Sequence, residues 1–315
     1  MHHSIKFLLT PILTLTFSTN AQAFMPDDDE IPTGEDHSDS SDKTINSQAF
    51  MPEEDEIATG DGHLNSSDKS GYTLFNPTPR DLWRPMSADR PDFTESPITV
   101  DAGAVQVELS FLDYASNGDE NALSVAPVNI KLGLLNNVDL QFVVDPYVNS
   151  DDGTSTKKGV SDIQFRLKIN LWGNDEGETA FAIMPFITIP TGSDGISGDH
   201  VEGGFIFPFA VGLTESIGMG LMFETDFVYD DLDSGFDTEF VATGVLGFDV
   251  TDAFGLYVEG IAIESTDSDV SFRGILGCGA TYSLTNDIMF DAGVNIGLVG
   301  DGDDVNIFTG ITFRF

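Results

Sequence analysis

The chain has 315 residues, of which 53 are acidic and 13 are basic, so its formal net charge is −40. This balance argues strongly against nucleic-acid binding, because proteins that bind nucleic acids need basic surface to neutralise phosphates. It fits a strongly solvated exterior, whose acidic loops could also hold divalent cations. The single cysteine, Cys278, excludes an intrachain disulfide bond.

Residues 1–23 have the pattern of a cleaved secretory signal peptide. A weakly basic start precedes an apolar stretch at residues 7–17, and Ala21-Gln22-Ala23 forms a small-residue cleavage site. The apolar stretch is shorter than the roughly 20 residues that a membrane-spanning helix needs. We therefore expect a mature chain that starts at Phe24, outside the cytoplasm, and expect any membrane span to be made of strands.

Residues 24–78 are expected to form a disordered acidic linker that contains a duplication. Residues 23–43 return as residues 49–69, at an offset of 26, and both copies end in Ser-Ser-Asp-Lys. Each copy has one small apolar cluster in an acidic background, which is typical of disorder. The alternative is a periplasmic docking tail or a cation-binding tether. Residues 79–101 then form a segment that precedes the barrel.

From residue 102 to residue 315, apolar and polar residues alternate along one segment after another. A period of two predicts strands, and each segment has at least the roughly 9–11 residues of a tilted membrane strand. Very short turns alternate with longer acidic loops, which is the asymmetry of an outer-membrane barrel. We therefore predict an all-β fold, an antiparallel transmembrane β-barrel of about 12 strands at residues 102–315, rather than a soluble β-sandwich. The expected strands are residues 102–114, 122–134, 137–148, 159–171, 178–190, 202–214, 216–229, 237–250, 253–265, 270–283, 286–299 and 304–315.

The last expected strand ends on an aromatic residue, Phe315. Ile307, Ile311 and Phe313 share one face with Phe315, whereas Phe308 is the exception to this pattern. A closed barrel removes the free edge of such a strand by pairing it with the first strand. The strand resembles the terminal strand of Gram-negative outer-membrane barrels, and the resemblance implies that Phe315 is a signal for the barrel assembly machinery.

If the apolar faces of the strands contact lipid, the opposite faces line the lumen. All five basic residues of the expected strands have this inward parity, as expected when an Arg or Lys facing the bilayer midplane would cost about 2–4 kcal/mol. These side chains could form salt-bridge ladders that fill the barrel, or they could line a permeation path for neutral or cationic solutes. The lumen-lining candidates are Glu108, Lys131, Asp139, Asp162, Arg166, Lys168, Glu224, Glu259, Arg273 and Asp291.

Two short motifs resemble a known family of outer-membrane transporters. Asp89-Arg90-Pro91-Asp92-Phe93 precedes the first strand, and Pro190-Thr191-Gly192 follows the fifth. Together with looser matches, they make residues 85–315 similar to the family labelled "MetA-pathway of phenol degradation". Lys131 stands where we expect this family to carry Arg, and the acidic duplication lies outside the family pattern.

The resemblance implies an outer-membrane channel that is associated with the uptake of aromatic or other hydrophobic compounds. For Arg90 and Asp92 two roles stay open. They could form a turn salt bridge at the periplasmic mouth, or their segment could enter the lumen as a small plug or gate.

The leading functional prediction is a passive channel for small solutes in the Gram-negative outer membrane. Its expected partners are outer-membrane lipid, the barrel assembly machinery and the solutes, and we expect no cofactor and no metal site. A structural or adhesive barrel with cation-binding or partner-binding acidic loops is the alternative. An outer-membrane hydrolase is less expected, because His200 is the one histidine of the barrel region and lies in a loop away from any strand serine.

Overall fold

The computed structural model describes residues 69–175, 177–230 and 234–315. The expected signal peptide and nearly all of the duplicated acidic segment lie outside these residues. Two short 3-10 turns, η1 (Lys69–Gly71) and η2 (Arg80–Leu82), precede the first strand. In the described part of the chain no helix is long and apolar enough to cross a membrane.

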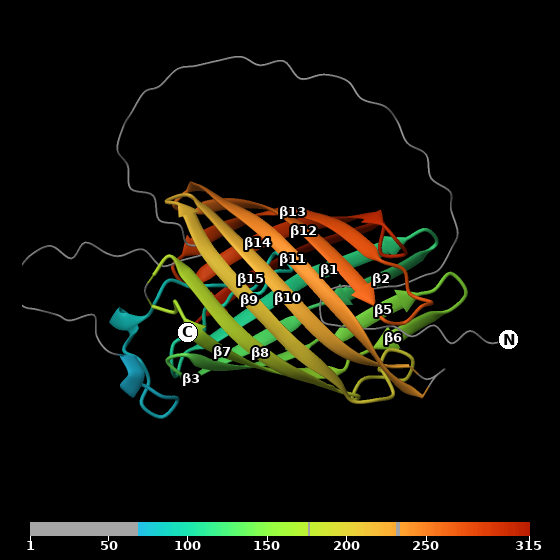
Figure 1. Ribbon diagram of the computed structural model, residues 1–315, viewed down its shortest axis with the longest axis horizontal. Coiled ribbons are helices and arrows are strands. Elements are labelled where there is room, and N and C mark those ends of the chain that lie inside the picture. Colours follow the sequence, from blue (N-terminus) through green and yellow to red (C-terminus); the bar gives the residue numbers. More distant parts are fainter. Residues whose placement is uncertain (1–68, 176, 231–233) are drawn as a thin grey trace, which may run out of the picture.

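The rest of the described chain is a single antiparallel sheet closed into a barrel (Figure 1). Its last strand pairs with its first, with Arg314 opposite Gln106, and this pairing closes the sheet. The strands are β1 (Val105–Asn117), β2 (Glu120–Val125), β3 (Val128–Leu135), β4 (Val138–Val144), β5 (Tyr147–Asp151), β6 (Thr156–Gly159), β7 (Ile163–Trp172), β8 (Thr179–Ile189), β9 (Glu202–Thr214), β10 (Ile217–Asp230), β11 (Gly235–Thr251), β12 (Phe254–Ser265), β13 (Arg273–Thr285), β14 (Ile288–Val299) and β15 (Val305–Arg314).

The fifteen strands make twelve spans of the barrel wall, because three expected strands are each divided in two. β2 and β3 form one span, and both pair with β1. β4 and β5 form the next span, and β6 and β7 form the one after it. Ala126, with a φ of 59°, and Pro127 interrupt the first of these spans, and Pro146 interrupts the second. Proline has no backbone N–H to donate to a neighbouring strand, so the ladder breaks where it occurs. The prediction of a twelve-stranded barrel is confirmed, with these interruptions added.

The two ends of the barrel differ. One end carries the short turns, the C-terminus and both 3-10 turns, and we call it the turn end; the other, which carries the longer connections, is the loop end (Figure 1). Two loops at the loop end are shorter than predicted. β1 and β2 meet in a tight hairpin around Gly118, whose φ of 55° suits such a turn, and β5 and β6 extend into the loop expected at residues 149–158.

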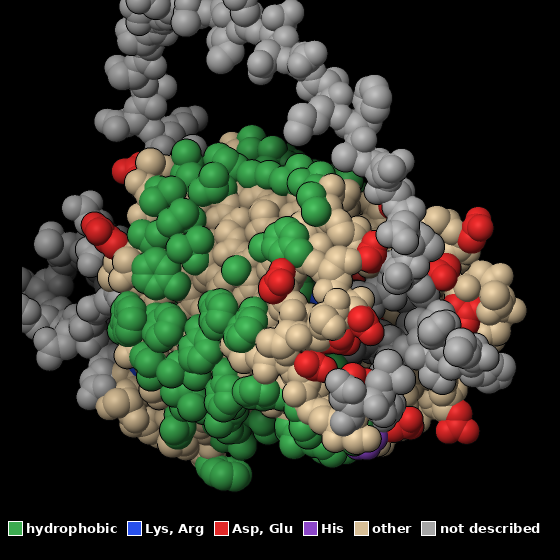
Figure 2. All heavy atoms as spheres, turned by 45° about the vertical axis from the view of Figure 1, so that its right-hand side comes forward, with side chains coloured by type: hydrophobic (Ala, Val, Ile, Leu, Met, Phe, Trp, Pro, Cys, Tyr) green, Lys and Arg blue, Asp and Glu red, His purple; other side chains and the backbone are tan. Residues whose placement is uncertain are grey.

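The outer wall is apolar and the inner wall is charged, as the alternation predicts. On β7, Phe165 and Leu171 are exposed on the outside, whereas Arg166 and Lys168 are buried in the lumen. Figure 2 shows hydrophobic side chains covering much of the wall, with Asp and Glu side chains gathered mainly at the loop end. This distribution is the one that a barrel in contact with lipid requires.

Candidate functional site

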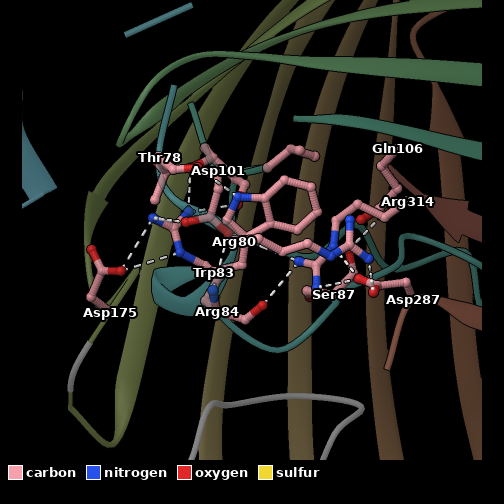
Figure 3. Close-up of polar contacts among 12 residues, drawn as sticks. Thr78, Arg80, Trp83, Arg84, Ser87, Asp101, Gln106, Asp175, Asp287 and Arg314 are labelled. Atoms are coloured by element: carbon pink, nitrogen blue, oxygen red, sulfur yellow. Dashed lines mark hydrogen bonds and ion pairs between the residues drawn. The ribbon is translucent and has the colours of Figure 1, made fainter. Parts of the chain in front are cut away.

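A segment that we call the plug (residues 84–101) enters the lumen from the turn end, runs inside the barrel and returns to the same end before β1. Its two legs meet at Arg84, whose Nη1 donates to the Thr99 carbonyl at 2.7 Å and whose backbone N–H donates to Asp101 at 3.0 Å. The same guanidinium reaches two turns of the barrel, at Asn136 (2.6 Å) and Asp175 (3.2 Å). Figure 3 shows this cluster beside the Arg314–Asp287 pair at the turn end. The base of the plug is therefore fastened to itself and to the wall.

Asp175 lies in the turn between β7 and β8, and its contacts with the plug base shift the pKa of its carboxyl. Burial alone would raise the pKa of its carboxyl, but Arg84, together with hydrogen bonds from Lys69 and Asn136, holds that pKa below its usual value. The ionised form of Asp175 is therefore the one that the plug base stabilises.

Arg90, near the tip of the plug, crosses the seam between the last strand and the first. Its guanidinium donates to both carboxylate oxygens of Asp291 on β14, at 3.1 and 2.6 Å, and also to Ser110 on β1. It lies 5.8 Å from the ring centroid of Phe308, which faces the lumen. The inward Phe308 was the exception in the sequence pattern, and it packs beneath the plug. Gly310 makes room for this arrangement, because a Cβ there would lie 2.5 Å from Arg90 Nη2.

Asp89 anchors the plug to a charged cluster on the opposite side of Arg90. It accepts from Lys168 Nζ at 2.8 Å and contacts Lys131, which also pairs with Glu108. Lys131 and Lys168 are each 1 % exposed, so both ammonium groups depend on these carboxylates for compensation. The cluster joins the plug to β1, β3 and β7.

The tip of the plug contacts the other half of the wall through Phe93, Thr94 and Glu95. Glu259 on β12 accepts the backbone N–H groups of Phe93 and Thr94, both at 2.8 Å, and Thr94 Oγ1 lies 2.6 Å from Thr243 Oγ1 on β11. Glu95 pairs with Arg166. The tip is therefore held by hydrogen bonds from the plug to Glu259 and Thr243 and by one ion pair.

An apolar patch covers part of the inner wall next to the tip. The sequence reasoning missed it, because β8 reads Thr-Ala-Phe-Ala-Ile-Met-Pro-Phe-Ile-Thr-Ile, with apolar residues on both faces. Phe93 of the plug packs against this patch. Its buried members are Met184, Phe186, Ile206, Met222, Val241, Ile261, Ile263 and Ile275.

Two chambers lie on either side of the plug tip. The loop-side chamber has about 710 Å³ of space not filled by atoms, its solvent-open part included, between the plug and residues such as Val128, Val143 and Ile206. The turn-side chamber has about 670 Å³, between the plug and residues such as Phe209 and Tyr257. Both chambers are lined by the same three plug residues, Arg90, Asp92 and Glu95. These residues therefore form the partition between two halves of one lumen.

The turn-side chamber continues toward the barrel mouth. A third space of about 420 Å³ at the turns near Asp252 and Asn286 shares Met86 and Met289 with it. The empty spaces thus follow one another from the turn end to the loop-side chamber, with the plug tip between them.

Nine of the ten lumen candidates are buried, each at most 8 % exposed. Asp162 is different: it lies just before β7 and accepts backbone N–H groups of Thr191, Gly192 and Gly198, which anchors the loop at residues 190–201. The buried nine are Glu108, Lys131, Asp139, Arg166, Lys168, Glu224, Glu259, Arg273 and Asp291.

Not all of the buried nine contact the plug. Seven bond to plug residues: Lys131, Lys168, Arg166, Asp291, Glu259, Glu108 through the Asp89 N–H at 3.1 Å, and Asp139 through the Val100 N–H at 3.0 Å. Arg273 instead pairs with Glu239 above the plug. The candidates therefore divide into those that fasten the plug and those that belong to the wall alone.

The remaining sequence candidates lie at the ends of the barrel. At the loop end, carboxylate oxygens of Asp230, Asp237 and Asp267 lie within 4.8 Å of one another, and the binding of divalent cations there stays a prediction. His200 stacks on Tyr229 with ring centroids 3.6 Å apart. Phe315 exchanges backbone hydrogen bonds of 2.9 Å with Val105 at the seam, and its role in assembly also stays a prediction.

Comparisons with known proteins agree with the resemblance in the sequence. The family model described as "Putative MetA-pathway of phenol degradation" matches residues 88–315. No curated protein matches the chain. Among solved structures, the COG4313 outer membrane channel from Pseudomonas putida F1 is similar at a TM-score of 0.55 and 15% identity, over 72% of this chain and 100% of that one. The NanC porin is similar at a TM-score of 0.48 and 11% identity, over 67% of this chain and 100% of that one.

Proposed function

The chain belongs to the family described as putative MetA-pathway of phenol degradation, and from that membership and the lumen geometry we propose a passive outer-membrane channel for small solutes whose gate is the plug. In this proposal the turn end faces the periplasm and the loop end faces the outside, the orientation in which short turns and long loops of such barrels are placed. The chain acts by diffusion and carries out no chemistry.

The observation that carries the proposal is the partition of the lumen. Two chambers of similar size share Arg90, Asp92 and Glu95 as lining, so a small movement of the plug tip would join them. A purely structural or adhesive barrel needs no chambers of this kind. Arg84 fastens the base of the plug to both of its legs and to two turns of the wall, whereas the tip is held by two backbone donors to Glu259 and by one ion pair, Glu95 with Arg166. The tip is accordingly the part that we expect to move.

A tether between plug and wall tests both parts of the proposal. Because Thr94 and Thr243 approach at 2.6 Å through their hydroxyl oxygens, the variant Thr94→Cys/Thr243→Cys, made in a Cys278→Ser background, can close a disulfide across the gate. The refolded full-length protein is placed in a planar bilayer and in liposomes with small neutral solutes. We expect channel events and solute entry in the reduced state and a marked drop of both in the oxidised state.

The two parts of the proposal fail in different ways. The absence of any conductance and of liposome swelling for the unmodified protein would reject a channel. Equal conductance in the oxidised and reduced states, with the disulfide verified by mass, would reject the plug as gate. The single variants Thr94→Cys and Thr243→Cys are the matched controls, since neither can form the tether.

A further inference from the structure

The carboxylates that line the loop-side chamber fall into two groups by their partners. Six acidic residues line this chamber against two arginines. Asp89, Glu95 and Glu108 each form an ion pair with Lys131, Lys168 or Arg166. The other three, Asp92, Asp145 and Glu224, have no Lys or Arg within 4.0 Å among the described residues.

Glu224 on β10 shows most clearly that a partner is missing. It is 7 % exposed and its carboxyl is hydrogen-bonded to that of another acid, Asp226, but among the described residues no Lys or Arg lies within 4.0 Å of it. Across the chamber, Glu95 Oε2 is buried without a hydrogen-bond partner, 4.0 Å from Lys168 Nζ. A buried carboxylate without a donor is costly, because it has lost water without replacing it. Both groups border an empty space in which a cationic donor could lie.

The same chamber offers an apolar surface beside these carboxylates. Phe93, Val143 and Ile206 line it, and Ile206 belongs to the apolar patch of the inner wall. A hydrated metal ion or a sugar would leave this surface without contacts. A hydrocarbon would cover it but would leave the carboxylates unpaired.

We propose that the loop-side chamber is a binding site for a small organic cation, an ammonium group carried on an aromatic or branched aliphatic body. The ammonium lies between Glu224, Glu95 and Asp92, and the body lies against Phe93, Val143 and Ile206. An ammonium supplies the positive charge that Asp92 and Glu224 lack and a donor for Glu95 Oε2, and it can also lie over an aromatic ring. This inference rests on the proposed function, for which it names the class of solute.

The charges at the plug tip determine which solutes can pass the gate. Asp92 and Glu95 line both chambers, so a bound cation that moves past the tip keeps contact with carboxylates on either side. A carboxylate solute would meet the like charge of Asp92, which has no basic partner among the described residues, and of Glu95, which Arg166 pairs only in part, and this disfavours it. The site therefore selects organic cations over neutral molecules of the same shape and excludes anions.

Three probes of equal size and different charge test the inference: benzylammonium, benzyl alcohol and benzoate. Binding to the refolded full-length protein in detergent is measured by calorimetry, and block of the open current is measured in planar bilayers. We expect benzylammonium to bind and block at concentrations about tenfold or more below those of benzyl alcohol, with no effect of benzoate. Glu224→Gln should weaken benzylammonium by about tenfold, as the loss of a charged hydrogen-bond partner does.

Asp269→Asn is the matched control, because it removes the same charge from an exposed loop at the loop end and should leave benzylammonium binding unchanged. Equal binding of the three probes, or equal loss in Glu224→Gln and Asp269→Asn, would overturn the inference. Calorimetry needs no conductance, so it answers this question even if the bilayer shows no channel. A conducting barrel without benzylammonium preference would leave the channel standing and reject only the cation site.

Discussion

Two groups of carboxylates share one lumen and differ in what surrounds them. Asp89, Glu108 and Asp291 each contact a Lys or Arg, and through these pairs the plug is bound to β1, β3, β7 and β14. Asp145 and Glu224 are equally buried and have no such partner among the described residues. The two groups therefore differ not in burial but in whether a Lys or Arg side chain pairs with the carboxylate. The paired group fastens the plug, whereas the unpaired group lines the loop-side chamber without a basic partner in the described part of the chain.

The largest expected effect comes from breaking the paired group at Lys131→Met. This change leaves Asp89 and Glu108 buried with one cation fewer, and removal of one member of a buried pair typically costs about 3–5 kcal/mol. We expect a lower free energy of unfolding in urea and a larger, noisier conductance, because the plug loses its anchor. Lys158→Met on the exposed face of β6 is the control. An unchanged conductance in Lys131→Met would show that this cluster does not hold the plug.

A second, steric change should act on the Arg90 anchor and on the neighbouring backbone of the seam. In Gly310→Ala the new Cβ would lie 2.5 Å from Arg90 Nη2 and 2.4 Å from the Leu109 carbonyl oxygen. Overpacking of this kind costs about 1–3 kcal/mol, and we expect Arg90 to leave Asp291 and the gate to open more often. Gly260→Ala, where a Cβ meets nothing within 4 Å, should behave as the unmodified protein in bilayer recordings.

If the paired carboxylates fasten the plug and the unpaired ones do not, neutralising one carboxylate of each group should have opposite effects on stability and on cation selectivity. Asp145→Asn keeps its place beside the Ser124 hydroxyl, which lies 3.1 Å away, so its unfolding free energy should change by no more than about 0.5 kcal/mol. Its reversal potential in a salt gradient should nevertheless show weaker cation selectivity.

Glu108→Gln should do the reverse, since it takes a charge from the Lys131 pair and lowers stability by about 1–3 kcal/mol. Similar stability losses in Asp145→Asn and Glu108→Gln would erase the distinction between fastening and unpaired carboxylates.

The smallest effect concerns the base of the plug and depends on pH. Because contacts with Arg84 lower the folded-state pKa of Asp175, its stabilising contribution is present above the ordinary carboxyl pKa of about 3.9 and is lost as the pH falls below it. Asp175 is partly exposed, so Asp175→Asn should lower the unfolding free energy at pH 7 by at most about 1 kcal/mol. Urea titrations at pH 7 and pH 3 should show the difference shrinking at the lower pH.

The sequence predicted the strands of the barrel wall better than it predicted the plug and its contacts inside the lumen. The alternation on β7 and the inward parity of Lys131, Arg166 and Lys168 follow from a period of two and from the cost of charge in lipid, which are local properties. The breaks at Pro127 and Pro146 had a visible signal, because proline cannot continue a ladder, yet the expected strands ran through both.

The plug contacts had no comparable signal. Asp89 finds Lys131 and Lys168 across 42 and 79 residues of sequence, and nothing local distinguishes it from the unpaired Asp92. The apolar patch was hidden because β8 is apolar on both faces, so parity could not tell lipid from lumen. The motif around Arg90 indicated a special segment, but the choice between a turn and a plug needed the three-dimensional contacts.

The position of Arg90 has a consequence for how the molecule is made. Its guanidinium contacts Ser110 on the first strand and Asp291 on the strand next to the last, and Arg314 of the last strand donates to the Arg84 carbonyl at 2.9 Å. These contacts lie on both sides of the seam between β15 and β1. An unclosed sheet cannot offer them, so the plug gains its complete set of partners only when the ring closes. We therefore expect closure of the barrel and seating of the plug to be coupled, and a barrel assembled without its plug to have a weaker seam.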